Sequence, residues 1–228
     1  MSYMQNVIGF DYYGTLVKLN SPFEKIKHML QKYIEDNFPE ISFNQFYISY
    51  QKNMAVLSTG KQIYQGINLL TESLDRTCNR YKIPSLNNIF VPFAEELFIF
   101  TEAYPDAGKV INFLKNNFIV GVLSNADNYL IDISIARHNF NFDFVITSED
   151  AGYSKPDNRF FEYALKRIGR RTHELYMIGD SQNDDILGAG RLGIKTIWIN
   201  RNGELLKEGM NTPCFEVKEL KEIPFLLT

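Results

Sequence analysis

The chain has 228 residues, of which 45% are apolar and 22% are charged, and its net charge at pH 7 is −3. This is the composition of a globular protein, and the length suits one large domain or a core with a smaller insert. The slight negative charge, without blocks of like charge, argues against a nucleic-acid partner, which would need clustered basic residues.

The sequence contains no recognisable targeting segment or membrane span. Residues 1–5 lack the cationic start and apolar run of a signal peptide. The longest apolar stretch, residues 89–100, contains a proline and two glutamates and is too short to span a bilayer. Cys78 and Cys214 lie far apart and lack the short spacing of a zinc site, so we interpret them as reduced thiols. These features predict a cytoplasmic protein without a membrane partner.

A carboxylate follows the first apolar run of the chain. Residues 7–10 (VIGF) are apolar and lead directly into Asp11, and Gly14 comes soon afterwards. A short apolar run bounded by turn residues is typical of a buried strand. We therefore predict a strand at residues 7–10 that carries Asp11 at its carboxyl end and is followed by a sharp turn.

Helical periodicity replaces this pattern from Ser21 onward. Ser21, Pro22 and Glu24 form the pattern of a capping box with proline at the first helical position. Ser42 and Gln45 repeat the box before a second predicted helix. The first predicted helix carries its apolar residues on one face: Ile26, Met29, Leu30, Tyr33 and Ile34.

The helical pattern continues to about residue 100 without a convincing strand. Breaks are expected near Gly60, Gly66 and Pro84, because glycine and proline interrupt helices. We therefore interpret residues 17–101 as an all-helical insert between the first strand and the rest of the chain.

Strands and helices alternate in the remainder of the chain. Strands are predicted at residues 118–123, 144–146, 175–178 and 196–199. Helices are predicted at residues 106–116, with Val110, Phe113 and Leu114 on one face, at residues 127–138, after Pro156 and from Gln182. Such alternation predicts a parallel sheet covered by helices on both faces. The predicted fold is α/β, with a Rossmann-like core of residues 1–16 and 102–228 and a helical domain of residues 17–101.

Polar side chains stand at the carboxyl ends of the predicted strands, where open parallel sheets bind their ligands. They are Asp11 after the first strand, Ser124 and Asn125 after the second, Lys155 in the loop after the third, and Asp180 with Asp184 and Asp185 after the fourth. We expect these side chains to meet at one edge of the sheet.

Four segments resemble, in order, the four motifs of the haloacid dehalogenase superfamily. They are DYYGTL at residues 11–16, LSN at 123–125, KPD at 155–157 and GDSQNDD at 179–185. Four short motifs in the correct order, each at a predicted strand end or in the loop beyond, form a specific signal. The resemblance covers the whole core, and the helical insert occupies the position of the family's helical cap. It implies a hydrolase with an α/β core.

The resemblance also implies a nucleophile and a metal site. In the family's phosphatases the first aspartate attacks phosphorus and forms a covalent ester that water then cleaves, which assigns this role to Asp11. Mg2+ prefers oxygen ligands, and the resemblance assigns to it the Asp11 carboxylate, the backbone carbonyl of Tyr13 and Asp180. Either Asp184 or Asp185 would support the metal through a bound water.

The other motif residues are expected to hold the substrate. By resemblance, Lys155 pairs with Asp11 and with the substrate phosphate, which offsets the repulsion between phosphate and carboxylate. Thr15, Ser124 and Asn125 are assigned to substrate binding. The implied substrate is a small phosphorylated molecule, and the motifs do not identify it.

Tyr13 departs from the family's phosphatase pattern, which has a second aspartate two residues after the nucleophile. That aspartate protonates the leaving oxygen and then activates water, whereas a phenol with a pKa of about 10 is poorly matched to this work at neutral pH. Tyr13 keeps the backbone carbonyl that the metal needs and remains a candidate catalytic residue. The pattern D-x-Y-G-T is instead similar to the first motif of the 2-haloacid dehalogenases, whose halide leaving group needs no proton and which use no Mg2+.

The fourth motif favours a phosphatase. The 2-haloacid dehalogenases replace the Gly-Asp metal ligand by serine and asparagine, whereas this chain keeps Gly179 and Asp180 with two further aspartates. Clustered carboxylates repel one another, and bound Mg2+ would remove that repulsion. The preferred interpretation is an Mg2+-dependent phosphatase. A metal-independent 2-haloacid dehalogenase and a catalytically weak phosphate-binding protein stay open as alternatives.

Overall fold

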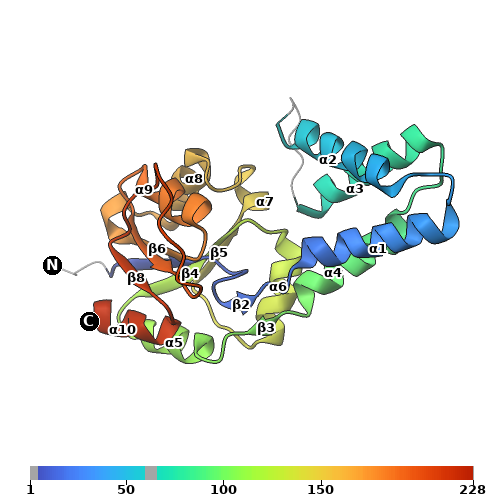
Figure 1. The fold of residues 1–228 in the computed structure, drawn as a ribbon. Coiled ribbons are helices and arrows are strands. Elements are labelled where there is room, and N and C mark those ends of the chain that lie inside the picture. The colour runs from blue at the N-terminus through green and yellow to red at the C-terminus, as the bar shows by residue number, and fades with distance from the viewer. Residues whose placement is uncertain (1–4, 60–65, 228) are drawn as a thin grey trace. The chain divides into compact units, whose positions relative to one another are not determined.

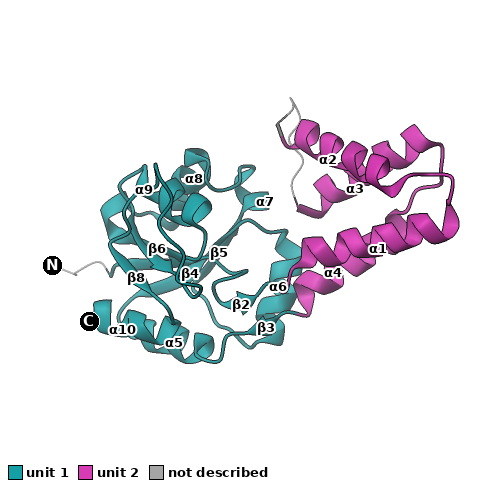
Figure 2. Ribbon diagram, viewed as in Figure 1, with its two compact units in different colours: residues 1–19, 101–228 teal, residues 20–100 magenta. Residues whose placement is uncertain are grey.

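The computed structural model describes residues 5–59 and 66–227 of the chain. The chain divides into two compact units, one of residues 1–19 and 101–228 and one of residues 20–100 (Figure 2). The break predicted near Gly60 lies outside the described residues.

Within the described residues, the larger unit contains a six-stranded sheet in which all paired strands are parallel (Figure 1). In spatial order the strands are β5 (Phe144–Thr147), β4 (Ile119–Ser124), β1 (Val7–Phe10), β6 (Leu175–Gly179), β7 (Lys195–Ile199) and β8 (Phe215–Val217). The sheet confirms the predicted α/β core. β8 was not predicted, because a three-residue strand with two exposed residues carries almost no apolar signal.

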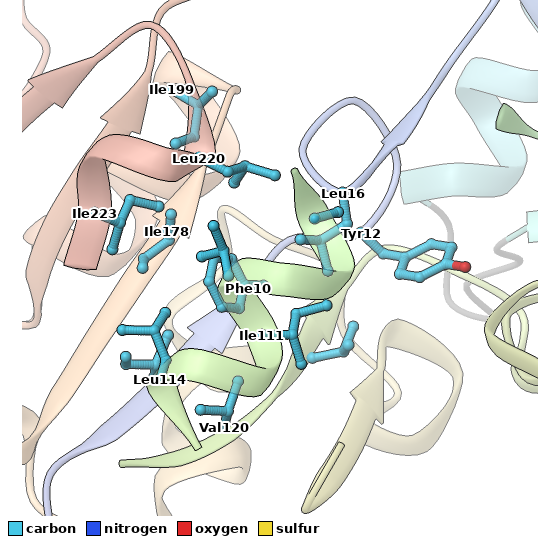
Figure 3. Packing of buried hydrophobic residues seen from close by; sticks show 14 of the residues in the cluster. Phe10, Tyr12, Leu16, Ile111, Leu114, Val120, Ile178, Ile199, Leu220 and Ile223 are labelled. Atoms are coloured by element: carbon cyan, nitrogen blue, oxygen red, sulfur yellow. The ribbon is translucent and has the colours of Figure 1, made fainter. Parts of the chain in front are cut away.

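The sheet is buried on both faces because side chains alternate along each strand. Ile8 belongs to one apolar cluster and its neighbour Val7 to another. Figure 3 shows the first cluster, in which Phe10 of β1 lies close to Ile111 of α5. The second cluster contains Phe160.

Helices cover both faces, as predicted. α5 (Ala107–Leu114), α6 (Asn128–Arg137) and α10 (Ile223–Leu227) contribute to the first cluster, and α8 (Asn158–Ile168) and α9 (Gly188–Gly190) contribute to the second (Figure 1). The other helical elements are α7 (Ser148–Ala151), the 3-10 turns η1 (Thr172–Glu174) and η3 (Leu220–Glu222), and the π-helical η2 (Gln182–Leu187).

The predicted apolar face of α5 is wrong at one position. Val110 and Leu114 are buried together with Ile111, but Phe113 is 47% exposed. The buried residues Ala107, Val110, Ile111 and Leu114 fall within an arc of about 100° around the helix, whereas Phe113 lies about 60° outside this arc, next to Val110. The helix therefore buries its shorter aliphatic side chains and leaves the ring outside.

A short ribbon joins the two ends of the inserted segment to the core. β2 (Val17–Lys18) and β3 (Glu102–Ala103) pair antiparallel, and the Nζ atom of Lys18 lies 2.7 Å from a carboxylate oxygen of Glu102. Strands of two residues have no readable period, so the sequence did not indicate them. The ribbon keeps residues 17–19 in the larger unit, and the inserted unit begins at residue 20 rather than at the predicted residue 17.

The inserted unit is helical in its described residues. Its helices are α1 (Pro22–Asn37), α2 (Phe43–Thr59), α3 (Gly66–Tyr81) and α4 (Asn87–Ile99). α2 packs on α3, while α4 packs on both α1 and α3. α1 buries Ile26, Leu30 and Ile34, and Met29 and Tyr33 are half-buried beside them.

The capping box predicted at the start of α1 is not formed. Ser21 lies in the left-handed backbone region with φ of 47°, and its side chain makes no capping hydrogen bond. A side-chain cap normally requires extended backbone at this position. Pro22 does begin the helix, because its fixed φ suits the first helical residue.

Two further features of the described residues concern membrane-spanning helices and the cysteines. Among residues 5–59 and 66–227, no helix combines the length and hydrophobicity that a membrane crossing requires. Cys78 is buried, Cys214 is exposed, and neither forms a disulfide.

Two phenylalanines test the packing of the core. We predict that Phe160→Ala lowers the free energy of unfolding by about 3–5 kcal/mol, because this ring is fully buried. Phe113→Ala, the matched control, should change it by only about 1 kcal/mol, since 47% of the residue is exposed. Urea unfolding followed by circular dichroism measures both values, and equal losses would contradict this arrangement.

Candidate active site

The order of the strands brings the predicted polar residues together. β1 lies between β4 and β6, and all three run parallel, so their carboxyl ends share one edge of the sheet. Asp11, Ser124 and Asp180 stand at these three ends. The backbone N–H of Asp11 still donates to the carbonyl of Ile178 at 2.8 Å, which fixes the end of β1 against β6.

Asp11 is buried and held by hydrogen bonds to one of its two carboxylate oxygens. The side chain of Ser124 and the Nζ atom of Lys155 each donate to Oδ1 at 2.9 Å. The other oxygen, Oδ2, has a long contact of 3.5 Å with the hydroxyl of Thr15. The carboxylate is therefore oriented through Oδ1.

Lys155 is the cation at the centre of the site. Its Nζ atom donates to Asp11 at 2.9 Å, to Asp185 at 2.6 Å and to the backbone carbonyl of Leu123 at 2.9 Å. These bonds use all three ammonium hydrogens. Burial alone would lower the pKa of Lys155, but the charges of Asp11 and Asp185 raise it above its ordinary value. The side chain therefore stays charged although it is almost fully buried.

Asn125 fixes the loop that carries Lys155. Its amide nitrogen donates to the carbonyl of Lys155 at 2.9 Å, and its amide oxygen accepts from the backbone N–H of Lys155 at 2.7 Å. This pair of bonds aligns the backbone from which the ammonium reaches Asp11. The predicted role of Asn125 in substrate binding stays a prediction.

Thr15 links the loop after β1 to the loop after β6. Its hydroxyl donates to the Asp180 carboxylate at 2.8 Å and accepts from the backbone N–H of Asp180 at 3.1 Å. The Thr15 side chain is fully buried. The described contacts thus show Thr15 supporting Asp180, and its assignment to substrate binding stays a prediction.

The structure separates the two neighbouring aspartates that the sequence left equivalent. Asp185 is fully buried and accepts hydrogen bonds from Lys155 at 2.6 Å and from the backbone N–H of Ser181 at 3.0 Å. Asp184 is half-buried and accepts from the side chain of Asn183. In the described chain, oxygens of Asp11, Asp180 and Asp185 lie within 4.8 Å of one another, and Asp184 is outside this group.

Two glycines make room for the carboxylates. Gly14 has φ of +90°, and a Cβ atom there would lie 2.6 Å from an oxygen of Asp180. A Cβ atom on Gly179 would collide with the Asp185 carboxylate. Only glycine leaves space for these two acids at such close approach to the backbone.

Tyr13 lies beside the nucleophile loop and is half-buried. Burial raises its pKa above the ordinary value, and the neighbouring Tyr12, Asp127 and Asp11 raise it further. The ring of Tyr12 meets it edge-on with centroids 5.0 Å apart. Tyr12 itself turns into the core, where its hydroxyl donates to Ser134 at 2.9 Å. The raised pKa makes Tyr13 still less suited to proton transfer at neutral pH than a free phenol.

The carboxylates carry more negative charge than the buried ammonium can neutralise. Burial, followed by the charge of Asp11, raises the pKa of Asp180 to about 6. The pKa of Asp185 is also raised by burial, although Lys155 opposes this shift. Three oxygen donors with a surplus of negative charge are the donor set that Mg2+ prefers. The residues present therefore fit a divalent cation.

The geometry and the motifs agree with a comparison against known proteins. A family model described as a haloacid dehalogenase-like hydrolase matches residues 5–193. The chain belongs to this family. The match includes the whole inserted unit and the four segments that gather around Asp11.

Members of this family with different activities resemble the chain. (S)-2-haloacid dehalogenase 1 of Pseudomonas sp. (strain CBS-3) is 28% identical over 226 residues, which cover 96% of this chain and 94% of that protein. The pyrimidine 5'-nucleotidase YjjG of Escherichia coli is 30% identical over 145 residues, 62% of this chain and 63% of the nucleotidase. The chain thus matches less than two thirds of the nucleotidase's length.

A solved structure shows the same fold. The 2-haloacid dehalogenase from Pseudomonas syringae pv. Tomato DC3000 superposes with a TM-score of 0.76 at 21% identity, covering 98% of both chains. Since relatives of the chain include both a nucleotidase and dehalogenases, overall similarity establishes a hydrolase of the haloacid dehalogenase-like family without choosing between these reactions.

Several supporting contacts at this edge of the sheet were not predicted. The indole N–H of Trp198, on β7, donates to the carbonyl of Asp180 at 3.1 Å. The hydroxyl of Ser181 accepts from the backbone N–H of Asp184 at 3.1 Å. Arg201, two residues after β7, donates to the loop after β1. Its place at a strand's carboxyl end was the available signal, but no motif of the resemblance includes it.

Lys155→Met tests the buried ion pairs. We predict that it lowers the free energy of unfolding by about 3–5 kcal/mol, because it leaves the carboxylates of Asp11 and Asp185 buried without their counter-ion. Lys18→Met is the matched control, since it removes a largely exposed ion pair with Glu102 worth about 1 kcal/mol or less. Urea unfolding without divalent cations compares the two. A Lys155 variant as stable as the control would contradict this account.

The pH dependence of stability should reveal the environment of Asp180. The folded protein holds the Asp180 proton more tightly than the unfolded chain, so the contribution of Asp180 to the free energy of unfolding falls as the pH rises from about 4 to about 6. In the presence of a chelator, we predict that Asp180→Asn gains stability relative to the wild type across this interval. Above about pH 6 the titration of Asp180 itself no longer changes this difference. Urea midpoints at several pH values measure it, and a difference independent of pH would contradict the shift.

Proposed function

We propose that the chain is an Mg2+-dependent phosphatase that acts on a small phosphorylated metabolite and uses Asp11 as its nucleophile. The observation that carries this proposal is the grouping of three carboxylates: Asp11 and Asp185 pair with the buried ammonium of Lys155, and the exposed Asp180 lies beside them. A site that binds only an anionic substrate would gain nothing from so many acids, because like charges in a poorly solvated site repel one another and the substrate.

The residues around Asp11 prepare it for attack on phosphorus. Ser124 and Lys155 hold Oδ1, so the carboxylate keeps one orientation relative to the strand ends. Attack forms a bond between an Asp11 oxygen and phosphorus while the bond from phosphorus to the leaving oxygen breaks. Water then cleaves the aspartyl-phosphate and restores the carboxylate. The Lys155 ammonium offsets part of the negative charge that the phosphate brings towards Asp11.

The metal would be held by residues that the fold already brings together. Asp11 and Asp180, with the backbone carbonyl of Tyr13, are the candidate ligands, and Asp185 would support the metal through a bound water. Bound Mg2+ would supply positive charge against the phosphate oxygens and the carboxylates. Thr15 keeps Asp180 in place through its two hydrogen bonds, and Lys155 does the same for Asp185.

Tyr13 narrows the substrates that such a site can process quickly. A tyrosine with a raised pKa is a poor source of the proton that an alkoxide leaving group needs. Phosphate esters of acidic alcohols, such as aryl phosphates, and acyl phosphates depart without that proton. We therefore expect a marked preference for good leaving groups.

A 2-haloacid dehalogenase is the second candidate. Tyr13 and the similarity to (S)-2-haloacid dehalogenase 1 over 96% of the chain favour it. In that reaction Asp11 would attack carbon and displace halide, which needs neither a proton nor a metal. The carboxylates of Asp180 and Asp185 argue against it, since they would repel an anionic haloacid.

Phosphate release from p-nitrophenyl phosphate is the test of the proposed reaction. We predict release that requires Mg2+ and falls by at least about 10³-fold in Asp11→Asn, because the amide cannot act as the nucleophile. Ser124→Ala, which keeps the nucleophile and removes one of its hydrogen bonds, should retain measurable activity. Chloride release from 2-chloropropionate in the presence of a chelator would instead establish the dehalogenase. Phosphate binding without either turnover would support a binding protein.

Substitution of Tyr13 tests whether the site lacks a general acid for the leaving oxygen. We predict that Tyr13→Asp raises the turnover of an alkyl phosphate by about 10-fold or more relative to p-nitrophenyl phosphate, because a carboxyl group can protonate the alkoxide. Tyr13→Phe is the control, which removes the hydroxyl without supplying an acid. If the aspartate variant has an unchanged or lower rate, then Tyr13 has a role of its own or another group supplies the proton.

A further inference from the structure

Arg201 lies at the same edge of the sheet as the proposed catalytic residues, although no motif includes it. It follows β7 by two residues, and β7 is paired with β6, which carries Asp180. Arg201 is half-buried. It lines a cavity of about 330 Å³ together with Tyr13, Gly14 and Asp180.

The guanidinium of Arg201 donates two hydrogen bonds to the turn that follows Asp11. Nη1 donates to the backbone carbonyl of Gly14 at 2.7 Å, and Nη2 donates to the backbone carbonyl of Thr15 at 2.7 Å. Charge-assisted bonds of this length are stronger than ordinary backbone bonds. The planar fork of arginine matches two successive carbonyls, which a lysine ammonium cannot do with the same geometry.

The ring of Tyr104 packs against one face of the guanidinium. The Cζ atom of Arg201 lies 3.5 Å from the centroid of the Tyr104 ring, a close cation–π contact. The backbone N–H of Tyr104 donates to the carbonyl of Leu16 at 3.0 Å, so Tyr104 is itself tied to the same turn. Arg201 is thus fixed between the ring and the two carbonyls.

The turn that Arg201 binds, residues 11–17, contains the groups on which the proposed reaction depends. Asp11 lies at its start, followed by Tyr13 and then Thr15, which supports Asp180. Within the turn, the backbone N–H groups of Leu16 and Val17 donate to the carbonyl of Tyr12. The bonds from Arg201 come from outside the turn and fix the peptide planes that follow Tyr13.

We propose that Arg201 is a positioning residue, which rests on the proposed phosphatase function and extends it. Through its two hydrogen bonds to Gly14 and Thr15, it holds the turn so that Asp11 and Asp180 keep their relative placement. This role requires the planar guanidinium with its two N–H donors, and a positive charge alone does not suffice. The chemistry of the reaction stays with Asp11, and the substrate need not touch Arg201.

Hydrogen exchange tests the positioning without relying on any reaction. Amide exchange of residues 11–17, followed by mass spectrometry, is compared in the wild type, Arg201→Lys, Arg201→Met and Arg191→Met. We expect exchange at least about 10-fold faster in both Arg201 variants, since each loses the two-carbonyl fork. Arg191, an exposed arginine near β7, is the control and should leave exchange unchanged. Unchanged exchange in Arg201→Met would overturn the proposal, whatever the activity of the wild type.

Steady-state kinetics tests whether the geometry of the Arg201 side chain, rather than its charge or its effect on stability, supports the proposed reaction. The substrate is p-nitrophenyl phosphate with Mg2+, under conditions where urea unfolding shows that both variants are folded. We expect kcat to fall about 10²-fold in Arg201→Lys and Arg201→Met, and KM to change by less than about threefold. Tyr104→Phe should keep kcat, because phenylalanine retains the ring. Full kcat in Arg201→Lys would assign the effect to charge and overturn the positioning role. Full kcat in folded Arg201→Met would show a purely structural role and overturn it as well.

The two measurements distinguish failure of the inference from failure of the proposed function. If the wild type releases no phosphate, the phosphatase is excluded, while faster exchange in both Arg201 variants would still support the positioning of the turn. If the wild type is active and the exchange of residues 11–17 does not change, Arg201 is not a positioning residue and the phosphatase stands.

Discussion

One buried ammonium organises the edge of the sheet where the motifs meet. The ammonium of Lys155 donates its three hydrogens to Asp11, Asp185 and the carbonyl of Leu123, so the end of β1, the π-helical segment after β6 and β4 are tied to a single charge. A buried lysine is costly unless it is fully paired. The placement of the loop after β5 and of the π-helical segment after β6 therefore depends on the two carboxylates staying in contact with it. Asn125 reinforces this arrangement by bonding the backbone of Lys155 itself.

The site is held from its other side by neutral and cationic donors. Thr15 bridges the loops after β1 and β6, and Trp198 and Arg201 brace the same loops from β7 and the segment after it. These contacts are partly buried and directed at backbone carbonyls or at Asp180. Such preorganisation is the condition under which a carboxylate can act repeatedly at one geometry, because the cost of ordering it is met during folding.

The chain combines Tyr13 with a group of three acidic residues, Asp11, Asp180 and Asp185. The acids form a site that suits a divalent cation, while the tyrosine leaves no evident acid for a poor leaving group. A hydrolase with this pattern would be selective for the reactivity of the bond as well as for the shape of the substrate. The sequence of the inserted helical unit carries no motif that identifies a ligand.

The sequence by itself determined the alternation of strands and helices, the parallel core and the identity of the residues at the strand ends. Apolar periodicity and motif order are local properties, and local properties can be read from a chain without coordinates. Tertiary structure alone decided which of two adjacent aspartates joins Asp11 and Asp180, because neighbouring side chains on a helical segment point in different directions and only packing orients them. It likewise decided the exposure of Phe113 and the β2–β3 ribbon that keeps residues 17–19 in the core. The hydrogen bond from Arg201 to Gly14, 187 positions away in the chain, also depends on the tertiary structure. Contacts between distant segments depend on how the sheet is ordered, and that order is a property of the whole fold.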